Sequence, residues 1–253
     1  MKIIIITQNE PFFLKENLTN LFSLLPRKCK IVGCIVSDVS PFGKKESFIQ
    51  KSIKTYKIFG LNFFLYYSLK YIHSKIFKGS IKNLLKKNNI KEIKLKGSIN
   101  NSANLKLISS YNPDLLVSIL GNQIFKKDLI NLASKGCINL HTALLPKYRG
   151  LMPTFWVLKN NEKYTGVSVF FVDEGIDSGP IILQKKIKID NKTQSELIQI
   201  TKNIGMELVA NAITLILNDQ VELIQNPDSE STYFSFPNKN DVKVFLKAGK
   251  KFF

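Results

Sequence analysis

The stretch of sequence that decides the fold is GCINLHTALLPKYRG, residues 136–150, together with GVSVFFVDEGIDSGP, residues 166–180. The first segment begins as a short strand, and because side chains alternate between the two faces of a strand, Asn139 and His141 point to the same side. The second segment begins as a strand rich in Val and Phe and ends in a turn composition that places Asp177 just past the strand end. Ligands of open α/β sheets bind at strand ends. The two segments therefore predict a sheet on which these three side chains meet.

Strands alternate with helices along most of the chain. The expected strands are 2–6, 30–36, 90–95, 114–120, 137–140, 166–172, 180–189 and 221–224, the expected helices are 11–25, 102–110, 151–159, 193–217 and 241–246, and residues 37–45 are expected to form a loop. This order predicts an α/β fold with a mostly parallel twisted sheet, flanking helices and an antiparallel extension. We expect one domain over residues 1–217 and a short C-terminal extension, residues 218–253, that packs on it.

The segment of residues 47–88 is helical in composition and rich in aromatic side chains. An aromatic stripe at helical spacing is most often part of a core, and we expect that role here. Two alternatives are an aromatic wall that stacks a nucleotide base and a helix that lies on a membrane surface. The function of this segment is left open by its sequence.

Composition limits the classes of protein to consider. The three cysteines form no C-x-x-C pair, and with only two histidines in the chain we expect no zinc site. Free thiols favour a reducing cytoplasm. We expect no signal peptide, since Ile3 to Ile6 is too short an apolar run, and no membrane span, since Lys70, His73 and Lys75 interrupt the most apolar later stretch.

The net charge of +18 raises the question of a nucleic-acid partner. Almost all of the excess is Lys, and only Arg27 and Arg149 are Arg, the residue that specific phosphate and base recognition favours. The lysines of residues 78–96 are interpreted first as a solvated helix face. Attraction of an anionic small substrate is the second interpretation.

Asn139, His141 and Asp177 combine an amide donor, an imidazole and a carboxylate. Each of them taken singly is more often structural, but together they suit acyl transfer to an amine, in which an oxyanion develops. One preorganised donor aimed at that oxygen contributes on the order of 3 kcal/mol. Asn139 and His141 can supply such donors, whereas Asp177 can orient the imidazole, favour its protonated form or hold a water that relays the amine proton. No Ser or Cys nucleophile is needed, because the amine attacks directly.

The motifs NLH at 139–141, LLPKYRG at 144–150 and DEGIDSG at 173–179 together resemble the folate-dependent formyltransferase family. The resemblance is close over residues 113–188 and looser over residues 1–36. It implies a Rossmann-like formyltransferase fold and 10-formyltetrahydrofolate as the formyl donor. The residue roles that it implies are catalysis by Asn139, His141 and Asp177, and binding of the pterin by Gln123, Ile124, Phe125, Asp173, Glu174, Gly175 and Ile176. One departure is that Thr142 and Ala143 follow the His, where the family often has Ser two positions after it.

The resemblance leaves several acceptors for the formyl group. No glycine follows the first strand at Thr7 to Pro11, so the backbone cradle for a glycinamide ribonucleotide phosphate is missing. We expect a nucleotide-linked amino sugar as the acceptor, because the residues after 217 are too few for the barrel of methionyl-tRNA formyltransferases. The alternatives are methionyl-tRNA, hydrolysis of the formyl donor, and a Lys-rich RNA-binding module without catalysis. We expect no stable nucleic-acid partner, and a homodimer is compatible with the sequence.

Overall fold

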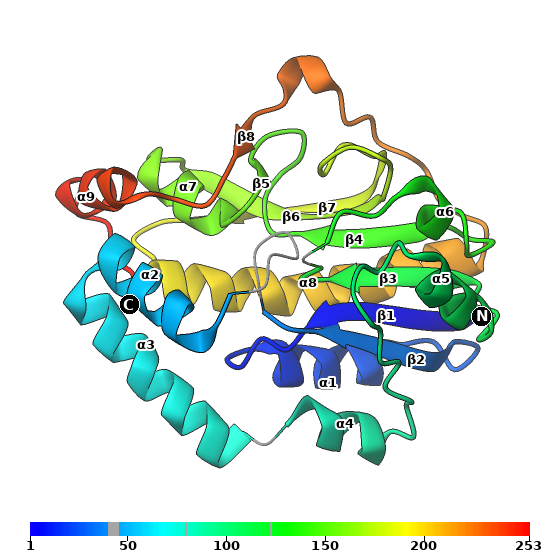
Figure 1. The fold of residues 1–253 in the computed structure, drawn as a ribbon. Helices are drawn as coiled ribbons and strands as arrows, with labels where there is room; N and C mark the ends of the chain where they lie inside the picture. The colour runs from blue at the N-terminus through cyan, green and yellow to red at the C-terminus, as the bar shows by residue number, and fades with distance from the viewer. Residues whose placement is uncertain (40–45, 79, 122) are drawn as a thin grey trace.

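The computed structural model describes residues 1–39, 46–78, 80–121 and 123–253. Six strands form the main sheet: β1 (Lys2–Gln8), β2 (Lys30–Ser37), β3 (Leu115–Ile119), β4 (Cys137–His141), β6 (Tyr164–Phe171) and β7 (Ile181–Lys188). Their order is β2-β1-β3-β4-β6-β7. The first four run parallel, whereas β6 is antiparallel to β4 and β7 is antiparallel to β6. The predicted α/β fold, a parallel sheet with an antiparallel extension, is therefore confirmed (Figure 1).

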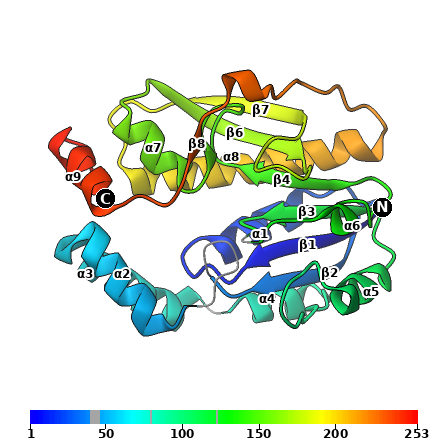
Figure 2. The ribbon, with the colours of Figure 1, turned by 45° about the horizontal axis from the view of Figure 1, so that its top comes forward.

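Helices cover both faces of this sheet (Figure 2). They are α1 (Leu14–Leu24), α2 (Phe48–Phe59), α3 (Leu61–His73), the π-helical turn η2 (Ser74–Lys78), α4 (Ile81–Lys87), α5 (Ser102–Ser109), α6 (Lys127–Ile130), α7 (Pro153–Lys159), α8 (Gln194–Leu217), the 3-10 turn η3 (Asp228–Glu230) and α9 (Lys239–Lys247). Ile3 and Ile5 of β1 pack in one core cluster with side chains of α1, α4 and α8. Ile4 and Ile6 point the other way, into a cluster with α5 and α6. The four buried isoleucines thus account for the two layers of helix by simple alternation.

The long helix α8 begins with the predicted capping box, in which Thr193 and Glu196 bond reciprocally. By length and composition it is the one helix of the described residues that could cross a membrane, but half of its most apolar window is buried. It packs against α1 and β6, as the core helix of a globular domain does. Helix α4 follows the expected pattern as well, because Ile81, Leu84 and Leu85 are buried and its lysines are exposed.

Two predicted strands are wrong. Residues 90–95 make a single bridge, from Glu92 to Cys34. Just after them, the side-chain amide of Asn104 donates to the backbone carbonyl groups of Lys96 and Ser98, so the chain there bonds to α5 and not to the sheet. Residues 221–224 likewise make one bridge, between Ile224 and Ile181 at the sheet edge. The predicted helix of residues 11–25 begins only at Leu14, and the predicted loop of residues 37–45 falls largely outside the described residues.

The C-terminal segment packs beside the end of the sheet. A second, two-stranded sheet joins β5 (Arg149–Gly150) to β8 (Tyr233–Phe234) in parallel. Helix α9 contacts α2 and α7, and its Phe245 stacks on Phe155 of α7 with ring centroids 4.9 Å apart. Phe252 joins the same aromatic cluster. These contacts hold the segment against residues 1–217, whereas the division of the chain at residue 217 stays a prediction.

Candidate functional site

Strand β4 is the place where the parallel half of the sheet meets the antiparallel extension. Asn139 lies opposite Ser118 of β3 on one side and opposite Phe170 of β6 on the other. His141 ends the strand, opposite Ser168. Asn139 and His141 both line the same cavity, as their spacing of two residues predicts. The sheet therefore delivers both side chains to one place.

His141 is held by contacts at both ring nitrogens. Its ring is buried, and Nε2 lies 2.7 Å from the carbonyl oxygen of Tyr148. Because a carbonyl oxygen only accepts, Nε2 carries a hydrogen and donates it. Nδ1 then faces Asp177, whose Oδ2 is 3.5 Å away. A carboxylate oxygen of Asp177 thus lies beside the second ring nitrogen.

Asp177 is positioned by its backbone and by two neighbouring segments. Its φ of 51° lies in the left-handed region, and its Oδ2 accepts the N–H of Gly150 at 2.8 Å. The Asn226 amide donates to the carbonyl oxygens of Asp177 and Gly179, both at 2.9 Å. These bonds hold the loop between β6 and β7 to Gly150 and to Asn226.

A clasp that sequence reasoning missed holds Asn226 in turn. The buried guanidinium of Arg149 donates to Asp228 at 2.6 Å and to both oxygens of Asn226 at 3.0 and 3.1 Å. We call Arg149, Asn226 and Asp228 the clasp. The only sequence signal for it is that Arg149 is one of two arginines in a chain that otherwise uses lysine. Planar, forked donors are what such a multiple contact requires.

We predict that Asn226→Ala loosens this loop. The substitution leaves two loop carbonyls without their donor and removes one acceptor of Arg149, the side-chain oxygen, so we expect a loss of about 1–3 kcal/mol in the free energy of unfolding. Urea unfolding followed by circular dichroism measures it. The neighbouring, exposed Gln225→Ala is the matched control and should leave the free energy of unfolding unchanged. Equal stability of the two variants would contradict the role of the clasp.

The cavity at the site has a volume of about 510 Å³, within the range of small-molecule sites. Its lining includes nine of the ten residues proposed for catalysis and pterin binding, namely Gln123, Ile124, Phe125, Asn139, His141, Asp173, Gly175, Ile176 and Asp177. Glu174 is not among the lining residues, and its side chain is exposed. The apolar wall and the few convergent polar groups fit a flat heteroaromatic ring.

The proposed pterin-binding residues are held in different ways. The side chain of Gln123 accepts the N–H of Ile99 at 2.9 Å, and the carbonyl oxygen of Ile124 accepts from Asn100 at 2.8 Å. Phe125 is largely buried in the core cluster and presents only part of its ring. On the opposite wall, Asp173 accepts the N–H of Gly175 at 3.0 Å and thereby shapes the turn. Binding by these residues stays a prediction.

An ion pair that the sequence did not suggest lines the same cavity. Lys202 of α8 lies 3.7 Å from Glu10, whose carboxylate also accepts the N–H groups of Phe12, Phe13 and Leu14. Burial lowers the pKa of Lys202, and the carboxylate of Glu10 opposes that effect. The two side chains therefore add an ion pair to the lining of the cavity.

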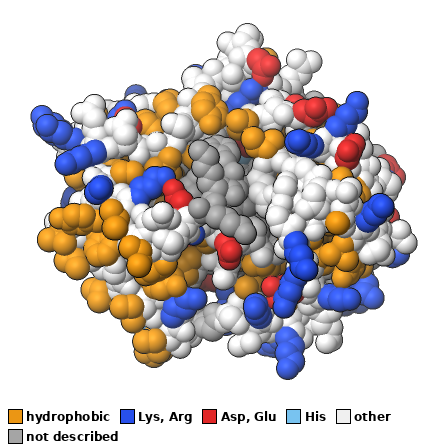
Figure 3. Space-filling model, viewed as in Figure 1, with side chains coloured by type: hydrophobic (Ala, Val, Ile, Leu, Met, Phe, Trp, Pro, Cys, Tyr) orange, Lys and Arg blue, Asp and Glu red, His pale blue; other side chains and the backbone are white. Residues whose placement is uncertain are grey.

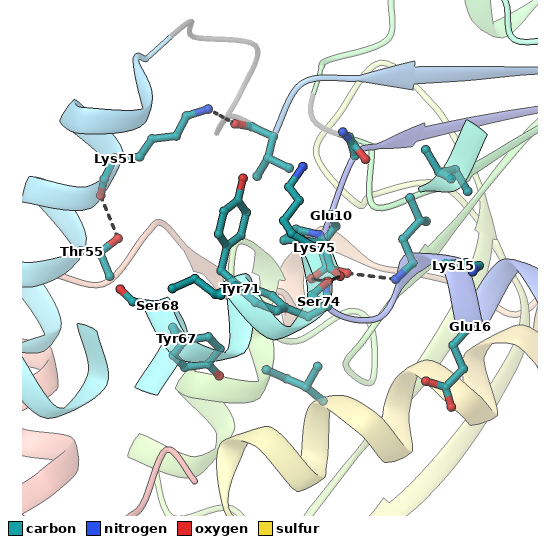
Figure 4. A pocket seen from close by; sticks show the side chains of 18 of the residues that line it. Glu10, Lys15, Glu16, Lys51, Thr55, Tyr67, Ser68, Tyr71, Ser74 and Lys75 are labelled. Atoms are coloured by element: carbon teal, nitrogen blue, oxygen red, sulfur yellow. Dashed lines mark hydrogen bonds between the residues drawn. The ribbon is translucent and has the colours of Figure 1, made fainter. Parts of the chain in front are cut away.

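A larger cleft of about 1380 Å³ adjoins this cavity and shares several of its lining residues, including Glu10, Tyr67 and Phe236. Figure 4 shows Tyr67, Tyr71 and Lys75 around the cleft together with groups from α2 and the start of α1. The prediction that the aromatic stripe of residues 47–88 is core is thus wrong for most of its members, since only Phe59 of these rings is buried. The helical spacing of the aromatic residues correctly indicated one face of α3, but that face lines the large cleft.

Four non-glycine residues in or beside the site have a left-handed backbone conformation. Leu120, Tyr148, Met152 and Asp177 all have φ between 51° and 61°, a region that side chains other than glycine rarely adopt. Three of them line the cavity, and Tyr148 supplies the carbonyl that holds His141. Such conformations persist only where the surrounding structure enforces them, and they are commonest at functional sites.

Asn139 lines the same cavity as the His141–Asp177 pair, at the end of a strand. Such a set of a donor amide, an imidazole and a carboxylate is suited to group transfer. Comparison with known families is more specific. The formyl transferase family matches residues 74–213, which is more than half of the chain. The chain belongs to the formyl transferase family. The resemblance inferred from the motifs is confirmed.

Among curated proteins, the chain is 33% identical over 165 residues to the methionyl-tRNA formyltransferase of Clostridium tetani, a match over 65% of this chain and 53% of that protein. It is 42% identical over 141 residues to the methionyl-tRNA formyltransferase of Thermodesulfovibrio yellowstonii, over 55% of this chain and 46% of that protein. The chain therefore spans about half the length of the curated relatives that it matches.

Solved structures give the same fold. A 4-N formyltransferase from Francisella tularensis superposes with a TM-score of 0.60 at 22% identity, over 93% of this chain and 76% of that one. The phosphoribosylglycinamide formyltransferase of Bacillus halodurans gives 0.59 at 18% identity, over 86% and 95%. The predicted Rossmann-like formyltransferase fold is confirmed. In the described residues no group of three or more His, Cys, Asp or Glu side chains is placed to hold a metal ion.

Proposed function

We propose that this protein transfers a formyl group from 10-formyltetrahydrofolate to a primary amine on a nucleotide-linked amino sugar. The observation that carries the proposal is the convergence of Asn139, His141 and Asp177 on one cavity. Membership of the formyl transferase family supports the same reaction. The donor's fit is supported by the apolar cavity and by the turn at Asp173 to Gly175 on its wall. We place the reaction in the cytoplasm, as the free cysteines predict.

The geometry suits direct attack of the amine on the formyl carbon. The Asn139 amide donates to the oxygen on which negative charge develops, and a ring N–H of His141 supports the same charge. Asp177 orients the imidazole and, through the oxygen not bonded to Gly150, accepts the proton that the amine loses. That proton then passes to the donor nitrogen as its bond to the formyl carbon breaks. The products are the formamide and tetrahydrofolate. The burial of His141 strengthens each of these interactions by excluding water.

The adjoining cleft supports a nucleotide-linked acceptor. Its aromatic wall, with Phe63, Tyr67 and Tyr71, offers flat surfaces for a nucleobase, and Lys51 and Lys75 lie among the same lining residues. Lysines near a rigid wall suit a diphosphate as point charges. A sugar 3N-formyl transferase of the same fold, with a TM-score of 0.59 at 21% identity, was solved in the presence of dTDP and 5-N-formyl-THF. Those two ligands are a nucleotide and a formylated folate, the classes that we propose for the large cleft and for the smaller cavity.

Methionyl-tRNA is the second candidate acceptor. The observation that favours it is the identity of 33–42% to methionyl-tRNA formyltransferases, higher than the 21–22% to the sugar 3N-formyl transferase and the 4-N formyltransferase cited above. Those relatives are matched over only about half of their length. The two candidates share the donor and the chemistry and differ in the acceptor alone.

We predict that the purified protein formylates a nucleotide-linked amino sugar and does not formylate methionyl-tRNA at a comparable rate. Equal enzyme and labelled 10-formyltetrahydrofolate are supplied with each acceptor in separate reactions. The rate should rise with pH until the acceptor amine is neutral, because only the neutral amine attacks. Tyr71→Leu should raise KM for the amino sugar nucleotide without affecting donor affinity. Transfer to methionyl-tRNA, with none to the amino sugar nucleotides, would overturn the choice of acceptor and leave the chemistry intact.

A further inference from the structure

Five aliphatic side chains of α3 and η2 form a stripe at helical spacing, and of these five only Ile72 also lines the large cleft. Leu61, Leu65, Leu69, Ile72 and Ile76 follow one another at spacings of four, four, three and four, which is one face of a helix. All five are exposed, and Leu69 is the most exposed of them at 69%. Figure 3 shows hydrophobic side chains gathered over α2 and α3. We call these five residues the α3 stripe.

The α3 stripe is not needed to anchor the helix. The other side of α3 does that, because Phe63 stacks on Phe59 with centroids 4.3 Å apart and meets Phe252 edge to face at 4.8 Å. Neighbouring side chains extend the exposed patch, with Ile49 and Ile53 at helical spacing on α2 and Phe77 on η2 at 72% exposure. A contiguous apolar patch on an element already fixed from its other side indicates a contact with something outside the chain.

The charged side chains of the segment that carries the α3 stripe are all of one sign, although Glu46 just before it pairs with Lys54 at 3.2 Å. Residues 47–91 contain ten lysines and no Asp or Glu. Among them Lys57 is exposed outside the large cleft, whereas Lys75 and Lys82 are exposed and also line it. A segment of apolar side chains and lysines without acidic residues complements an anionic lipid surface, where the aliphatic groups enter the boundary of the acyl chains and the lysines meet the phosphates.

We propose that the α2–α3 hairpin docks this protein on an anionic membrane surface through the α3 stripe. A second copy of the chain fits the stripe less well. A two-fold interface brings the same patch of each copy together, so two segments that carry only positive charge would face one another. A lipid surface removes that repulsion and supplies the missing negative charge. Most of the hairpin also precedes residue 74, where the match to the formyl transferase family begins, so this surface is a feature of the chain beyond the matched region.

Flotation with lipid vesicles tests the proposal without any assay of transfer activity. The purified protein is mixed with vesicles of phosphatidylcholine alone or of phosphatidylcholine with phosphatidylglycerol. We expect it to float with the anionic vesicles only, and less so as salt is raised, because the lysine contacts are screened. Leu65→Glu/Leu69→Glu should weaken the apparent affinity at least about tenfold by placing charge in the apolar stripe.

The matched control is Leu24→Glu/Leu223→Glu, which makes the same charge change at two exposed leucines outside the hairpin and should float like the wild type. If the hairpin variant misfolds by circular dichroism, Phe77→Trp replaces it, because a tryptophan there keeps the patch apolar and should shift its emission to the blue on anionic vesicles alone. Three results would overturn the proposal: no flotation of the wild type, equal flotation of the hairpin variant, or a wild-type dimer that the hairpin variant turns into a monomer in light scattering.

Discussion

We expect kcat for formyl transfer to fall by at least about 100-fold in each of His141→Ala, Asn139→Ala and Asp177→Ala, the scale of one lost oxyanion donor or proton-transfer group. The expectation rests on the contact of His141 with Asp177 at 3.5 Å and on the cavity that all three residues line. Single-turnover rates with labelled donor measure the effect apart from binding. The variants should remain folded, with unchanged far-ultraviolet circular dichroism.

Matched controls separate this effect from the loss of any imidazole or amide. His73→Ala removes the only other histidine, which is exposed on α3, and Asn88→Ala removes an exposed amide at the end of α4. Both should retain the wild-type kcat. Near-wild-type turnover in all three site variants would show that the reaction proceeds elsewhere.

We expect the affinity for a folate analogue to fall in Gly175→Val and in Gly179→Val, with the larger fall in Gly179→Val. A Cβ at Gly179 would collide with the backbone carbonyl of Phe171, which cannot turn aside, so the loop itself must move. A Cβ at Gly175 would collide with the hydroxyl of Ser178, which bonds to Asp173 at 2.6 Å. Overpacking of this kind costs about 1–3 kcal/mol, which corresponds to a loss of roughly 5- to 150-fold in affinity where it falls on the binding conformation.

Calorimetry of each variant with a folate analogue and then with the acceptor measures the two affinities on one sample. Only the analogue's affinity should fall, because the loop lines the smaller cavity, and residues 173–179 do not line the larger cleft. Equal weakening of both ligands would mean that the loop supports the fold as a whole and does not bind the donor specifically.

The parts of the fold that local pattern determines were predicted correctly. The alternation of Asn139 and His141 along β4 placed both on one face, and Thr193 with Glu196 located the start of α8. These features depend on residues two or three apart, whose relative positions are fixed by strand or helix geometry. The assignment to the formyl transferase family rested on the same short motifs and is confirmed.

The parts that failed depend on distant partners. Residues 90–95 have strand composition, but they pair with β2 through one bridge only, and the chain that follows is hydrogen-bonded by the side chain of Asn104 instead. Aromatic periodicity on α3 identified a face, but whether that face meets a core or a cleft is decided by what lies across from it. The clasp joins Arg149 to residues more than seventy positions away, a relation that no local pattern contains.

The attachment of Asp177 to Asn226 also orders the assembly of the site in time. The two residues are 49 positions apart, and α8 lies between them. During synthesis from the ribosome, β4 and the loop after β6 therefore emerge well before the side chain that fastens the loop. The sheet can form early, since its strands are all made by residue 188, but the His–Asp pair acquires its final geometry only after α8 has formed and the chain has turned back. The reactive centre is thus completed late in folding, on a scaffold that is already in place.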